Sequence, residues 1–98
     1  MAPFNTPSIE RLFAAILSLR DQEDCAKFFE DICTIKELQA MVQRFQVACQ
    51  LEAGWNYNQV SSETGASSAT ISRVSKCLNY GSGGYREALD RMKEEGTL

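Results

Sequence analysis

The sequence contains no histidine, and this absence bears first on catalysis and metal binding. Histidine is the side chain that enzymes use most often for acid–base chemistry, and it is a common zinc ligand. The four cysteines, Cys25, Cys33, Cys49 and Cys77, form no CxxC pair, and no glycine-rich phosphate loop is present. We therefore expect no enzymatic activity, no cofactor and no metal site. We interpret the cysteines as small, reduced core residues, with disulfides as the alternative.

Long apolar runs are also missing, as is any pattern typical of an export signal. No stretch approaches the roughly 20 apolar residues that cross a bilayer. The opening segment, MAPFNTPSIE, lacks a basic stretch followed by an apolar one. These features predict a cytoplasmic protein with no membrane partner. At 98 residues, the chain is expected to form a single domain over residues 1–98.

Positive charge is scarce, because the net charge of the whole chain is -3. This balance argues against a general nucleic-acid binder, but the charge is unevenly distributed. Of the segments 1–54, 55–80 and 81–98, only the second has a positive net charge, because Arg73 and Lys76 outweigh Glu63. Attraction to phosphates sets much of the affinity for nucleic acids, so one such segment should bind weakly. A dimer would double its contacts.

Apolar residues recur at helical spacing along most of the chain, and capping residues mark where helices begin. No strand is predicted, so the expected fold class is all-α. The pattern predicts six helices: from Thr6-Pro7 to about Leu19, from Asp21 with an apolar stripe to Ile32, from Thr34 to about Glu52, from Asn56 to about Thr64, from Ser67 with inward residues to Leu78, and from Tyr85 to about Lys93.

Bulky apolar side chains are numerous for helices as short as these. Phe13, Phe28, Phe29, Met41 and Phe45 are more than thin helices should hide within one small chain. A second copy of the chain is the expected cover, which predicts a homodimer. A monomeric six-helix bundle is the alternative.

The segment from Trp55 to Tyr80, WNYNQVSSETGASSATISRVSKCLNY, carries the clearest functional signal. Two short helices are expected here, joined at Gly65, because glycine adopts positive φ without steric cost. This is the arrangement of a helix-turn-helix, whose second helix enters the DNA major groove. We assign it to residues 56–79.

The outward side of the second predicted helix carries small hydroxyl residues and two cations. Burial of Ile71, Val74 and Leu78 would leave this side free. Hydroxyl and cationic groups contact phosphates and base edges, and a helix N-terminus attracts phosphate. The DNA-binding residues predicted from this pattern are Ser67, Ser68, Ala69, Thr70, Ser72, Arg73 and Lys76. Two alternatives stay open: a pair of capped surface helices, or a helical interaction module whose head docks on a protein.

The chain resembles the Trp repressor superfamily, in its YerC/YecD-type branch. The matching text is FFEDICTIKELQAMVQRFQVACQL, from Phe28 to Leu51, and then NYNQVSSETGASSATISRVSKCLNYGSGGYREAL. The resemblance covers Ile9 to Met92 and is sharpest in SSETGASSATISRVSKCLNYG. It implies an intertwined homodimer whose N-terminal helices interlock, and a regulator, usually a repressor, that binds double-stranded DNA. Asn58 and Ser61 stand where the relative has basic phosphate contacts, which adds Asn58 to the predicted DNA-binding residues.

The resemblance also implies a pocket for a small effector. In the Trp repressor an indole lies between two arginines, which match Arg44 and Arg73, and further pocket positions match Thr34 and Cys77. Val74, however, stands where the tryptophan-binding protein has glycine, and Cys77 stands where it has serine. A branched side chain would crowd the indole slot, and a thiol is a poor partner for an ammonium group. We therefore expect an unknown effector, or none, in place of tryptophan.

Overall fold

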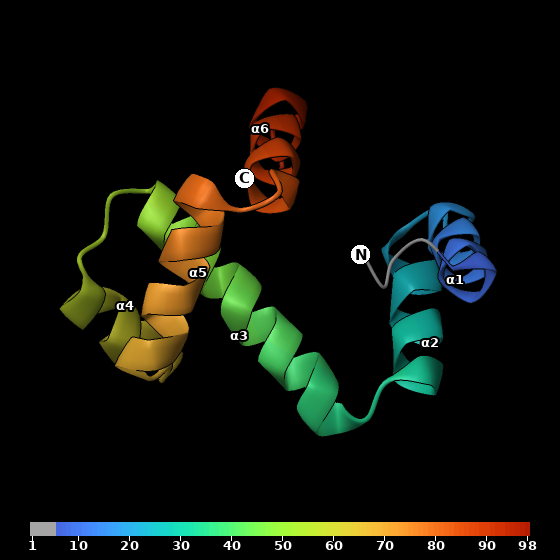
Figure 1. The fold of residues 1–98 in the computed structure, drawn as a ribbon, viewed down its shortest axis with the longest axis horizontal. Coiled ribbons are helices and arrows are strands. Elements are labelled where there is room, and N and C mark those ends of the chain that lie inside the picture. The colour runs from blue at the N-terminus through green and yellow to red at the C-terminus, as the bar shows by residue number, and fades with distance from the viewer. Residues whose placement is uncertain (1–5) are drawn as a thin grey trace. The chain divides into compact units, whose positions relative to one another are not determined.

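Figure 1 shows the chain in a computed structural model that describes residues 6–98. These residues form six α-helices and no strand, which confirms the predicted all-α class. The helices are α1 (Pro7–Leu17), α2 (Gln22–Ile32), α3 (Ile35–Glu52), α4 (Tyr57–Thr64), α5 (Ser68–Tyr80) and α6 (Gly84–Glu95).

The ends of two helices differ from the sequence prediction. The first helix ends at Leu17 instead of Leu19, and the hydroxyl of Ser18 donates to the carbonyl of Ala15 (2.6 Å) where the helix stops. The last helix runs two residues past Lys93, until Gly96 adopts a left-handed conformation with φ 74°. Helix ends are set by single capping contacts, so apolar spacing locates them only roughly.

The predicted capping residues start the helices as expected. The Thr34 hydroxyl accepts from the amide of Glu37 (3.1 Å), and the Glu37 carboxylate accepts from the amide of Thr34 (2.8 Å). Asn56 and Gln59 form the same reciprocal pair at 2.9 and 3.0 Å. Such pairs satisfy two amides that the helix itself leaves without partners. Side-chain caps also start the helices at Thr6, Asp21 and Ser67.

The chain divides into two compact units, one ending at Leu38 and the other beginning at Gln39. In the described part of the first unit, neither α1 nor α2 buries a single residue. The rings of Phe28 and Phe29 contact each other edge to face, with centroids 5.5 Å apart. Leu17 nevertheless remains 85% exposed. The apolar stripes of these helices therefore lack a complete cover within the unit.

The second unit contains the hydrophobic core. Its fully buried side chains come from α3, α4, α5, α6 and the turn between α4 and α5: Val47, Ala48, Val60, Ala66, Ile71, Val74 and Leu89. Leu78 is half-buried and packs against this core. The inward face predicted for α5, with Ile71, Val74 and Leu78, is thus confirmed.

The interpretation of all four cysteines as core residues is wrong. All four are free thiols, but Cys25 and Cys77 are exposed, and Cys33 and Cys49 are only half-buried. Cys25 lies on α2, which buries no residue, and Cys77 lies at the edge of a cavity. Only Cys49 packs against the core.

Candidate nucleic-acid interface

The turn between α4 and α5 is held by a short series of hydrogen bonds. Gly65 has φ 72°, and its amide donates to the carbonyl of Ser61 at 2.9 Å, which closes the end of α4. The Ser61 hydroxyl donates to the carbonyl of Ala66 (3.1 Å), while the amide of Ala66 donates to the Thr64 hydroxyl (3.1 Å). Ala66 itself is buried. The turn therefore has one fixed geometry, as a helix-turn-helix requires.

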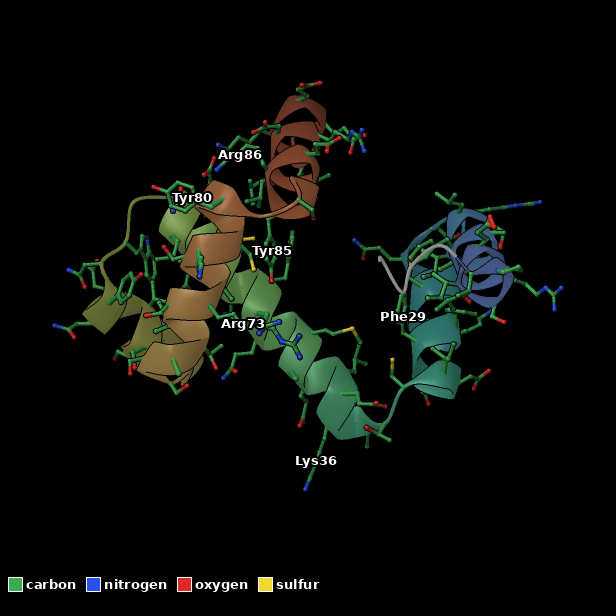
Figure 2. All side chains as sticks on the ribbon, viewed as in Figure 1. Phe29, Lys36, Arg73, Tyr80, Tyr85 and Arg86 are labelled. Carbon is green, nitrogen blue, oxygen red and sulfur yellow. The ribbon has the colours of Figure 1, made fainter. Side chains whose placement is uncertain are left out.

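The second helix of the pair is anchored at its start and along one face. The Ser67 hydroxyl accepts from the amide of Thr70 at 3.1 Å and caps α5. Ile71 and Val74 are 1% and 2% exposed on its inner face. Because residues three or four apart share one side of a helix, burial of these two positions leaves the opposite side outward. Arg73 lies on this helix (Figure 2).

The predicted DNA-binding residues lie mostly at the surface. Thr70 is the exception, since it is half-buried and its hydroxyl accepts from the Ser67 hydroxyl (3.1 Å). Ser67 and Thr70 therefore both take part in the cap of α5, and Ser67 remains exposed. The exposed members are Asn58, Ser67, Ser68, Ala69, Ser72, Arg73 and Lys76.

The two cations of α5 are not neutralised within the described part of the chain. Neither Arg73 nor Lys76 takes part in any ion pair found among residues 6–98. On α6, in contrast, Arg86, Arg91 and Lys93 each pair with a carboxylate. The outward side of α5 thus offers two free positive charges beside small hydroxyl groups, which is the chemistry that contacts phosphates and base edges.

The four residues predicted to form an effector pocket do not line one common cavity in the part of the chain that the structure describes. The Thr34 hydroxyl caps α3. Cys77 lines a cavity of about 440 Å³ together with Phe45 and Tyr85, and neither Arg44 nor Arg73 lines that cavity. Arg44 and Arg73 are both exposed. The effector pocket therefore stays a prediction.

The sequence patterns missed the contacts that hold the helix-turn-helix on the rest of its unit. The Gln43 side-chain amide donates to the carbonyl of Thr64 (3.1 Å) and joins α3 to the end of α4. Glu52, the last residue of α3, pairs with Arg86 and Lys93 of α6. These partners are 21, 34 and 41 residues apart. No local spacing signals such contacts.

Glu52 and its cationic partners on α6 stabilise one another's charged forms. The hydrogen bonds from Arg86, and then those from Lys93, lower the pKa of the Glu52 carboxyl to about 2. The same contact raises the pKa of the Arg86 guanidinium above its usual range. The pair is thus fully ionised at neutral pH, and the Glu52 side chain is only 15% exposed.

Comparison with known proteins places this fold and helix-turn-helix in a family of regulators. Residues 7–93 match the Trp repressor protein family, and the chain belongs to that family, which is regulatory and not enzymatic. The chain is 54% identical over 89 residues to the uncharacterized protein YerC of Bacillus subtilis (strain 168), covering 91% of this chain and 86% of YerC. The resemblance found in the sequence is therefore confirmed.

Two solved structures share the fold. A TrpR-like protein from Eubacterium eligens ATCC 27750 is 47% identical with a TM-score of 0.88, covering 92% of this chain and 93% of the other. A candidate Trp repressor from Staphylococcus aureus is 41% identical with a TM-score of 0.89, covering 95% and 96%. Both similarities cover more than nine-tenths of the chain and show a Trp repressor-like fold.

The described residues contain neither a membrane-spanning helix nor a cluster of metal ligands. No helix within residues 6–98 is both long and apolar enough to cross a bilayer. In the same part of the chain, no three cysteine, aspartate or glutamate side chains gather as metal ligands would.

Proposed function

We propose that the protein is a transcriptional regulator that binds double-stranded DNA through α4 and α5 and acts as a repressor. The observation that carries this proposal is the division of α5 into a buried inner face and an outward face with free cations. In a helix-turn-helix the second helix enters the major groove, while the first crosses the phosphate backbone. Ser68, Ala69 and Ser72 would then approach base edges.

Two groups near these small side chains supply the electrostatic attraction. Arg73 has a fork of donors that can bind a guanine edge or a phosphate, and Lys76 is a point charge suited to a phosphate. The exposed Asn58 on α4 would contact the DNA backbone as an uncharged donor. The number of cations is small, so one helix-turn-helix head (residues 56–79) should bind DNA weakly on its own.

A homodimer would overcome this weakness by presenting two heads. The proposal rests on the apolar side chains that α1, α2 and the start of α3 leave uncovered. Leu17, Ile32 and Ile35 are 85%, 51% and 75% exposed, and such exposure marks surfaces that associate. Two heads related by a two-fold axis would read half-sites about one DNA turn apart. Light scattering at micromolar concentration should give the mass of two chains, and the mass of one chain would refute the dimer.

Tryptophan is not the proposed co-repressor. Val74, which stands where the tryptophan-binding protein has glycine, lies on the inner face of α5 with 2% exposure. Its branched side chain therefore fills space beneath this helix that a glycine would leave open. A different effector, or none, acts on this protein in our proposal.

Selection of bound fragments from genomic DNA tests the function directly. The purified protein should enrich a small set of sequences with two-fold symmetry. Fluorescence anisotropy on the enriched duplex should then show binding that weakens steeply as salt rises. No binding to any duplex at low salt would overturn the proposal.

One observation favours a second candidate function, a head that docks on a protein. The chain as a whole is acidic, with a net charge of -3, and α4 carries no cation at all. A partner protein would tolerate this balance better than DNA does. A failed DNA selection, together with a stable complex with a specific protein, would favour this alternative.

A further inference from the structure

Helix α5, the second helix of the helix-turn-helix and here called the reading helix, packs against α4 and α6. The link from α5 to α6 begins at Gly81, directly after the last residue of α5. A Cβ atom at Gly81 would lie 2.3 Å from the carbonyl oxygen of Cys77, so only glycine fits there. The chain therefore leaves α5 in close contact with its last turn, and only three residues separate the two helices. The position of α6 is thereby coupled to the position of α5.

Apolar packing alone does not fully fix α6 against the rest of its unit. Leu89 is buried, and the ring of Tyr85 stacks on Phe45 of α3 with centroids 6.3 Å apart. Between these contacts and the end of α5, however, lies the cavity of about 440 Å³ that is lined by Phe45, Cys77 and Tyr85 and is open to solvent. Apolar contacts therefore cover only part of this side of α6, and they hold the helix less firmly than a close-packed core would.

The ionic contact at the other side of α6 restricts this freedom. The two guanidinium nitrogens of Arg86 donate to the two carboxylate oxygens of Glu52, each at 2.7 Å. Lys93, two turns further along α6, also contacts the Glu52 carboxylate. Paired donors fix an orientation as well as a distance. Figure 2 shows Tyr85 and Arg86 on α6, where it faces α3 and the end of α5.

We propose that α6 is a brace for the reading helix and that Glu52 and Arg86 are positioning residues for sequence-specific DNA recognition. The inference rests on the proposed function. Neither residue lies among the exposed groups assigned to the DNA, so both act through the placement of α5. Base readout depends on the exact position of side chains in the groove, whereas attraction to phosphates depends mainly on charge. The brace should therefore affect specific binding more than non-specific binding.

The experiment compares two dissociation constants for each variant, one for the selected duplex and one for a scrambled duplex of equal length. Glu52→Gln removes the charge at nearly constant shape, and Arg86→Lys keeps the charge but loses the paired geometry. Asp90→Asn is the matched control, since Asp90 is the more exposed and more distant partner of Arg86 (3.3 Å). Circular dichroism shows whether each variant is folded at the assay temperature.

Glu52→Gln and Arg86→Lys should each lower the ratio of specific to non-specific affinity by about five- to thirtyfold, within the usual range of coupling between sites. Affinity for the scrambled duplex should stay within about twofold, because Arg73 and Lys76 remain in place, and Asp90→Asn should leave the ratio unchanged. A folded Glu52→Gln variant with the wild-type ratio would overturn the inference. If Glu52→Gln does not fold, Arg86→Lys decides in the same way. A wild-type protein that binds neither duplex would instead refute the proposed function, and the inference with it.

Discussion

The side-chain amide of Gln43 donates a hydrogen bond of 3.1 Å to the backbone carbonyl of Thr64, 21 residues away. Carbonyls in the last turn of a helix lack partners within that helix. The amide therefore satisfies an acceptor at the end of α4 and fixes the helix-turn-helix to α3. This contact is partly buried.

Replacing Gln43 by leucine should lower the free energy of unfolding by about 1–2 kcal/mol, because a partly buried carbonyl loses its donor. Urea denaturation followed by circular dichroism measures this change. Gln46→Leu is the matched control, since Gln46 lies exposed on the same helix. Equal stability of the two variants would contradict the role given to Gln43.

Removing both cations of α5 should weaken DNA binding and flatten its salt dependence. We expect Arg73→Ala combined with Lys76→Ala to lower affinity by about one to two orders of magnitude, because phosphate and base contacts are lost together. An anisotropy titration at several salt concentrations measures both effects. Arg91→Ala, which removes an exposed cation from α6, should change neither. If the double variant kept the wild-type dependence of affinity on salt, the outward side of α5 would not be the DNA-binding surface.

The Glu52 contact should make stability depend on pH in the acid range. Hydrogen bonds from Arg86 and Lys93 lower the pKa of Glu52 from 4.5 to about 2 in the folded chain. A pKa lower in the folded than in the unfolded chain stabilises the fold above the unfolded value. This contribution should be complete above about pH 4.5 and should disappear as pH falls towards 2.

Comparison of the wild type with Glu52→Gln isolates that contribution. The difference in midpoint of thermal unfolding should be largest at neutral pH and should shrink steadily below pH 4.5. Glu87→Gln, which breaks an exposed pair with Arg91, should show a much smaller difference at every pH. A wild-type advantage that stayed constant down to pH 2 would show that the charge of Glu52 is not responsible.

Tryptophan should leave the DNA affinity of this protein unchanged. The buried side chain of Val74 occupies the position that is glycine in the tryptophan-binding relative. Isothermal titration calorimetry with millimolar tryptophan should detect no binding, and anisotropy on the selected duplex should give the same dissociation constant with and without it. A tighter complex in its presence would restore tryptophan as a co-repressor.

Local interactions explain why much of the fold was predictable. Capping pairs such as Thr34 with Glu37, and Asn56 with Gln59, join residues three apart, so they leave a readable pattern in the sequence. The inward face of α5 was predictable for the same reason, because helical periodicity places Ile71 and Val74 on one side. The outward residues followed from that choice, and their contact with DNA stays a prediction.

Contacts between distant residues were not predictable. The pairing of Glu52 with Arg86 spans 34 residues, and neither side chain differs in type or spacing from an ordinary solvated charge. The position of Cys77 at a cavity, instead of in the core, depends equally on where α3 and α6 lie. Such features arise from tertiary packing, which a single sequence does not encode in any local pattern.

The first two helices bury none of their own side chains, and this has a consequence for the supply of active protein. If the protein is the homodimer proposed above, a newly made molecule keeps these segments uncovered until it meets a second copy. Formation of the working species would then depend on encounters between molecules. At low expression, its amount would rise more steeply than in proportion to synthesis, so a modest change in production would give a sharper change in regulation.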